Sequence, residues 1–100
     1  MIERVIVRRL AKQDIREARK WYRKISPLLG DDSTVALNRA IAVVREHPFA
    51  FQVVHRTFRR ILLHRFPYAL FYHAEKERIV IVAVLHQSRD GPTPVSWTGC

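Results

Sequence analysis

The sequence predicts an α+β domain in which an N-terminal strand and a helical hairpin precede an antiparallel β-meander, with both helices packed on one face of the sheet. Three patterns support this order: β-branched residues at 5–7, apolar positions spaced by three and four from Ala11, and an apolar period of two after Phe51. A length of 100 residues suits one domain. We expect that domain to span residues 1–90, followed by an irregular tail at 91–100.

The first predicted helix starts near Ala11 and is amphipathic. Lysines and arginines occupy the side opposite its apolar stripe, which consists of Ala11, Ile15, Ala18, Tyr22, Ile25 and Leu29. A residue that precedes proline is disfavoured in helical conformation, so Ser26-Pro27, with Gly30 close behind, predicts the end of this helix.

A second helix is expected to start within residues 31–34, because Asp, Asp, Ser and Thr are good N-cap residues and their acidic members favour a helix N-terminus. Its broad apolar face consists of Ala36, Leu37, Ala40, Ile41, Val43 and Val44. Pro48 ends it. The short connection between the two helices predicts a helical hairpin.

Four strands are predicted from the alternating segments 52–55, 58–66, 68–74 and 78–86. Their short connections indicate an antiparallel meander. Strand 58–66 carries charge on both faces, so Arg60, His64 or Arg65, and His86 are expected to gather on a sheet surface that the helices leave uncovered.

The chain is strongly basic, with 18 Lys and Arg against 9 Asp and Glu and a net charge of +9. Most of the cations are arginines, which favour planar anions such as phosphate and carboxylate. An anionic partner is therefore expected, and charge alone leaves nucleic acid and an acidic protein as alternatives.

Several classes are disfavoured by what the sequence contains. Its longest apolar run, residues 79–85, is far shorter than the roughly 20 residues that span a bilayer. Charged residues interrupt the N-terminal hydrophobes, unlike a signal peptide, so a cytoplasmic location is expected. A single cysteine, Cys100, excludes an internal disulfide, and the histidine spacings and scarce glycines predict neither a metal site nor a nucleotide cofactor.

The candidate functional residues each have a structural alternative. The cations of the first helix can follow a phosphate backbone or form a solvated face, and Trp21 can serve a partner or complete the edge of the core. The main candidate is a cluster of Arg60, Arg65, His86 and Arg89, for which exposed charge at strand ends is the alternative.

Several motifs resemble the RelE/ParE toxin superfamily, and its ParE branch in particular. The resemblance rests on Asp14-Ile15, Ala18 and Trp21-Tyr22 in the first helix, on Leu29-Gly30, on the run 59–72 that contains Phe66-Pro67-Tyr68, and on the segment 84–90. It covers residues 5–97 and implies a toxin of a type II toxin–antitoxin system, one that serves plasmid or locus maintenance. The ParE branch implies a non-enzymatic inhibitor of DNA gyrase, whereas the RelE branch implies a metal-independent, ribosome-dependent mRNA endoribonuclease.

The resemblance also implies partners and site residues. For the nuclease alternative the candidates are Arg60, His86 and Arg89, although the sequence has no Tyr after Tyr72 and lacks the lysine-rich strand of RelE. A cognate antitoxin is expected to supply an acidic segment. Residues expected to contact the target or the antitoxin are Arg16, Arg19, Trp21, Arg23, Arg60, Arg65, His86, Arg89 and Trp97. A third alternative is a basic protein that keeps only an antitoxin-binding or regulatory role.

Overall fold

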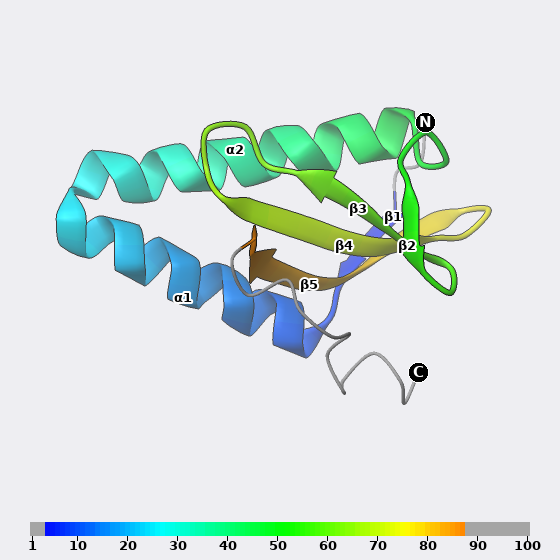
Figure 1. Ribbon diagram of the computed structural model, residues 1–100, viewed down its shortest axis with the longest axis horizontal. Helices are drawn as coiled ribbons and strands as arrows, with labels where there is room; N and C mark the ends of the chain where they lie inside the picture. Colours follow the sequence, from blue (N-terminus) through cyan, green and yellow to red (C-terminus); the bar gives the residue numbers. More distant parts are fainter. Residues whose placement is uncertain (1–3, 88–100) are drawn as a thin grey trace.

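Two helices that meet at Ser26 form the hairpin of this protein. The computed structural model describes residues 4–87, in which α1 spans Arg9–Ile25 and α2 spans Pro27–Glu46. Ser26 is extended and caps both helices, and its amide donates to the Tyr22 carbonyl across 3.0 Å. Figure 1 shows the hairpin converging at one end of the molecule. The predicted break at Ser26-Pro27 is confirmed.

The predicted start of the second helix within residues 31–34 is wrong, because α2 already begins at Pro27. The fixed φ of proline suits the first helical position, where its missing N–H costs nothing. Ser33 and Thr34 then lie inside the helix, and their hydroxyls donate to the Gly30 carbonyl at 2.7 and 3.3 Å. Gly30 is buried in α2 instead of ending α1.

Five strands form one sheet in the order β1-β5-β4-β3-β2. They are β1 (Arg4–Val7), β2 (Val53–His55), β3 (Phe58–Leu62), β4 (Tyr68–Ala74) and β5 (Arg78–His86). Strands β2 to β5 form the predicted antiparallel meander. The N-terminal strand β1 joins the sheet by pairing in parallel with β5, which makes the sheet mixed.

The strand predicted over residues 58–66 is shorter than expected and ends at Leu62. Residues 63–67 turn back toward β4, where the Tyr68 amide donates to the Phe66 carbonyl at 2.8 Å. Arg65 adopts a φ of 71°, which takes the chain out of extended conformation. Leu63 and Phe66 are both buried in the helix-facing core as a result.

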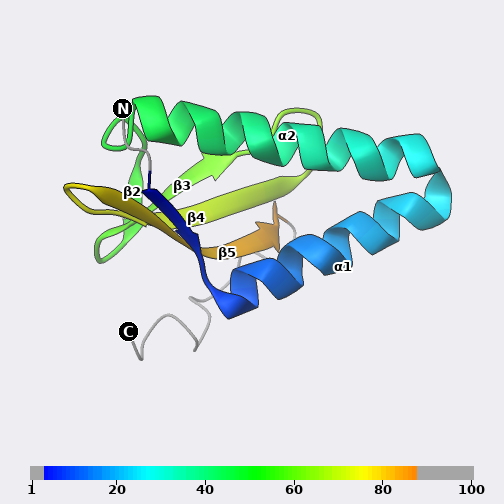
Figure 2. The same cartoon turned by 180° about the vertical axis from the view of Figure 1, so that it is seen from behind.

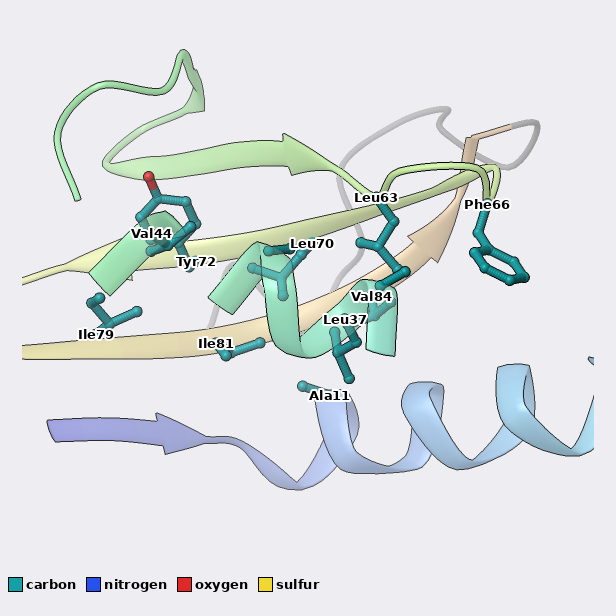
Figure 3. Close-up of a cluster of buried hydrophobic side chains, with 12 residues drawn as sticks. Ala11, Leu37, Val44, Leu63, Phe66, Leu70, Tyr72, Ile79, Ile81 and Val84 are labelled. Carbon is teal, nitrogen blue, oxygen red and sulfur yellow. The ribbon is translucent and has the colours of Figure 1, made fainter. Parts of the chain in front are cut away.

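The main core lies between the hairpin and one face of the sheet (Figure 3). Its buried side chains come from both layers and include Ala11, Leu37, Ala40, Val44, Leu70, Tyr72, Ile79, Ile81 and Val84. The other sheet face carries a second buried cluster of Phe58, Ala69, Phe71, Val80, Val82 and Ala83. Figure 2 shows the helices and the sheet from behind.

Side chains also fix the loop that leads from α2 into the sheet. The hydroxyl of the fully buried Tyr72 donates to the Pro48 carbonyl across 2.9 Å. Arg59 donates to the carbonyls of Phe49 and Phe51 at 3.2 and 2.6 Å, and its guanidinium lies 5.3 Å from the Phe49 ring centroid. These contacts hold the loop against β3 and β4. Neither helix within residues 4–87 has the length and apolarity needed to cross a membrane.

Candidate functional site

A cavity of about 240 Å³ lies between α1 and the end of β5. Its walls include two carboxylates, two aromatic rings and an imidazole, contributed by Asp14, Glu17, Trp21, Tyr68 and His86. The structure thus brings together Trp21 and His86, two of the site residues predicted from the sequence. It adds Asp14, Glu17 and Tyr68, which sequence reasoning did not assign to the site.

A signal for the acidic wall was present in the sequence. Asp14, Glu17 and Trp21 are spaced by three and four residues, which places them along one side of a helix, next to the apolar stripe. Tyr68 had no comparable signal, because its position beside His86 depends on the register between β4 and β5. In that register Tyr68 and His86 are direct partners.

Aromatic contacts order the wall of the cavity. The rings of Tyr68 and His86 meet edge to face with centroids 5.2 Å apart. The ring centroids of Tyr68 and Tyr22 are 6.2 Å apart, and those of Tyr22 and Phe66 are 4.8 Å apart. Burial raises the pKa of Tyr22, and the neighbouring Tyr68 raises it further. This aromatic row connects the cavity with the interior of the hairpin, and it holds the His86 imidazole beside α1.

Asp14 is the half-buried acid of the cavity. One of its carboxylate oxygens accepts a 3.0 Å hydrogen bond from the Val84 amide of β5. Burial raises the pKa of Asp14 and the neighbouring Glu17 raises it further, while the Val84 hydrogen bond acts in the opposite direction. Asp14 therefore positions α1 on β5 and also gives this part of a basic protein a local negative charge.

Apolar side chains are exposed around the hairpin turn. Trp21, Ile25 and Leu28 are 59%, 62% and 74% exposed, and we call these three residues the hairpin patch. The predicted site residues Arg16, Arg19 and Arg23 are exposed on the same helix, α1. Aromatic and aliphatic side chains bordered by arginine are typical of protein-binding surfaces.

Arg60 lies on the opposite face of the sheet from His86, contrary to the expectation that they share one surface. Arg60 is the partner of Phe71, which is buried in the second cluster, away from the helices. His86 is the partner of Tyr68, which packs against the helix-facing core. Phe71 and Tyr68 are three residues apart on β4, and an odd separation along a strand reverses the side-chain direction.

The remaining predicted site residues are placed elsewhere or are not described. Arg65 lies in the connection between β3 and β4, with its guanidinium 3.7 Å from the Asp32 carboxylate and 5.8 Å from the Phe66 ring centroid. Arg89 and Trp97 lie outside the residues that the structure describes. Across residues 4–87, no three His, Cys, Asp or Glu side chains are grouped so that they could hold a metal ion.

Residues 5–91 match the family model described as "ParE toxin of type II toxin-antitoxin system, parDE". No curated protein matches the chain. A solved structure titled "Chromosomal ParDE TA system from P. aeruginosa" has a similar fold, with a TM-score of 0.73 and 15% sequence identity over 83% of this chain and 94% of that chain.

Proposed function

Since this chain belongs to the ParE toxin family of type II toxin–antitoxin systems, we propose that it inhibits DNA gyrase and is neutralised by binding a cognate antitoxin. The observation that carries the proposal is the family match over residues 5–91, which includes both helices and every strand from β2 to β5. The proposal places the protein in the cytoplasm, where gyrase acts on DNA.

The hairpin patch and the adjoining cavity are the proposed antitoxin site. Trp21 belongs to both, so one partner segment can cover its indole and fill the 240 Å³ cavity beside it. The net charge of +9 attracts an acidic segment over a distance, and Arg16, Arg19 and Arg23 supply part of that charge. We assign the affinity for the antitoxin mainly to the apolar side chains of the hairpin patch. Aromatic side chains that become buried on binding dominate the energy of most protein interfaces.

The geometry supports a non-enzymatic toxin better than the endoribonuclease alternative. A metal-independent nuclease needs its acid–base and cationic side chains around one ribose and phosphate. Arg60 and His86, the described candidates for those roles, face opposite sides of the sheet. One bound nucleotide cannot contact both side chains across a sheet whose two faces are packed with buried residues.

The proposal is tested by pulsed expression without antitoxin. DNA supercoiling, covalent gyrase–DNA cleavage complexes and transcript integrity are measured in the same cells. We expect trapped cleavage complexes and intact transcripts. Codon-proximal cuts in mRNA with normal supercoiling would instead identify a ribosome-dependent nuclease.

A His86→Ala variant adds a second readout to that experiment. His86 lies at the end of β5 and contacts Tyr68, so its loss removes an imidazole without opening the central core. A gyrase inhibitor is expected to lose less than about tenfold in activity in this variant, which corresponds to about 1.4 kcal/mol. A nuclease that uses His86 for proton transfer would lose about 100-fold or more.

A further inference from the structure

The outer side of α1 is almost entirely cationic. It carries seven exposed cations, Arg9, Lys12, Arg16, Arg19, Lys20, Arg23 and Lys24, which we call the basic stripe. With about 100° of rotation per residue, all seven fall within an arc of about 140° on the helix. The buried Ala11 and the half-buried Ile15 and Tyr22 lie on the other side, against the core. The stripe is therefore a continuous charged surface on the solvent side of α1. At its edge toward α2, Arg19 borders a small cavity between the helices and the stem of Arg23 packs against Gly30.

No apolar side chain interrupts the basic stripe. Within the same arc, Gln13 is the only residue of α1 that is not a cation. The two acids of the helix, Asp14 and Glu17, lie outside the arc on the cavity side. Trp21 lies about 140° from the centre of the stripe, so the hairpin patch and the stripe are separate surfaces.

The absence of apolar side chains from the basic stripe favours some anionic partners over others. A protein partner is usually held by buried aromatic or aliphatic anchors, and lysine is depleted in such interfaces. Single-stranded nucleic acid is usually held by aromatic rings on which its bases stack. The stripe offers neither kind of anchor. A row of cations without apolar side chains is instead suited to the phosphates of a rigid duplex, whose binding is dominated by the release of counterions.

The dimensions of the stripe agree with this partner. From Arg9 to Lys24 the helix rises about 22 Å, at about 1.5 Å per residue. One strand of duplex DNA presents a phosphate about every 3.4 Å along the axis, or about six over that length. The first turn of α1 contains no acidic side chain, so its N-terminal dipole adds to the positive charge.

We propose that the basic stripe of α1 binds the phosphate backbone of double-stranded DNA without reading its sequence. The inference does not depend on which enzyme the toxin inhibits. The stripe contains no residue of the hairpin patch or of the cavity, although its Arg16, Arg19 and Arg23 are also among the cations proposed to attract the antitoxin. Backbone contacts of this kind position a protein on a duplex and carry little sequence information.

The test measures how salt weakens the binding of the purified full chain to a labelled DNA duplex, between about 50 and 200 mM salt. The test variant is Lys12→Gln/Arg16→Gln/Lys20→Gln, in which glutamine preserves helix propensity. Its control is Arg4→Gln/Arg39→Gln/Lys76→Gln, which removes three exposed cations outside the stripe. Both triple variants lower the formal charge from +9 to +6.

We expect the test variant to reduce the slope of log K against log salt concentration by about 2.7, or about 0.9 for each lost phosphate contact. The control is expected to change the slope by less than about 0.5, because long-range charge alone does not release counterions at a contact. If circular dichroism shows that the test variant is unfolded, Arg16→Gln alone replaces it, with an expected reduction of about 0.9.

Three results would overturn the proposal. The first is a test variant whose slope of log K against log salt concentration equals that of the wild type. The second is a control variant whose slope falls by as much as that of the test variant. The third is tighter binding of a poly-glutamate peptide or a single-stranded RNA than of the duplex at equal salt, which would assign the stripe to an acidic protein segment or to an unpaired strand.

Discussion

The Val84 amide of β5 donates a 3.0 Å hydrogen bond to the carboxylate of Asp14 on α1, across 70 residues of sequence. This bond joins the hairpin to the sheet at the edge of the cavity that Trp21 and His86 also line. Asp14 therefore holds α1 on the sheet and also lines the candidate site.

Replacing Asp14 with alanine is expected to lower the free energy of unfolding by about 1–3 kcal/mol, because the partly buried Val84 amide loses its acceptor. Urea unfolding followed by circular dichroism measures the change. Glu17→Ala is the control. Glu17 is exposed, and we expect its loss to change the free energy by less than about 0.5 kcal/mol. Equal effects of the two substitutions would show that the Val84 hydrogen bond contributes little.

Alkaline pH is expected to destabilise the protein partly through Tyr72. Burial raises the pKa of Tyr72 from 10.0 to about 12, although nearby Arg59 lowers it somewhat. The folded state therefore holds this proton more tightly than the unfolded state does, and the associated stability is lost as the pH rises from 10 to about 12. Unfolding free energies measured across this range should fall more steeply for the wild type than for Tyr72→Phe. Parallel curves would contradict the role of Tyr72.

At neutral pH the same Tyr72→Phe variant is expected to be less stable than the wild type by about 1 kcal/mol. It removes the hydroxyl that donates to the Pro48 carbonyl, while the ring still fills the core. Thermal or urea unfolding provides the measurement. A variant as stable as the wild type would indicate that water satisfies the Pro48 carbonyl equally well.

Gly30 is expected to resist substitution although it lies in a helix. A Cβ at this position would lie 2.1 Å from Cγ of Arg23, close to the backbone of α1. Gly30→Ala should therefore destabilise the hairpin by about 1–3 kcal/mol despite the better helix propensity of alanine. A double-mutant cycle with Arg23→Ala tests the cause, and removing Cγ should recover at least about 1 kcal/mol. An additive cycle would exclude the contact with Arg23.

Trp21→Ala is expected to weaken antitoxin binding by about 30-fold, which corresponds to about 2 kcal/mol. Trp21 is 59% exposed, so the free energy of unfolding should change by less than about 0.5 kcal/mol. Titration calorimetry with the cognate antitoxin measures the affinity.

The matched control for Trp21 is Leu62→Ala. Leu62 is 53% exposed but lies on the sheet face directed away from the hairpin, where its partner is Ala69. We expect less than about a threefold change in antitoxin affinity for this variant, or about 0.6 kcal/mol. If the Leu62 variant loses as much affinity as the Trp21 variant, the proposed antitoxin site is on the wrong surface.

The sequence by itself determined which elements form and in what order. Local patterns are set by neighbours a few residues apart, so the apolar stripe of α1 and the continuous apolar run of β5 could be recognised without the fold. The break at Ser26-Pro27 was equally local, because proline acts on the residue before it. Motif resemblance predicted the toxin family, and the family match confirmed it.

Only the tertiary structure decided which side chains meet. The parallel pairing of β1 with β5 and the opposite directions of Arg60 and His86 depend on strand register. The joint cavity of Trp21 and His86 depends on how α1 packs on β5. A register shift of one residue moves a side chain to the other face while leaving the local pattern unchanged. These contacts join residues far apart in sequence, so no local pattern specifies them.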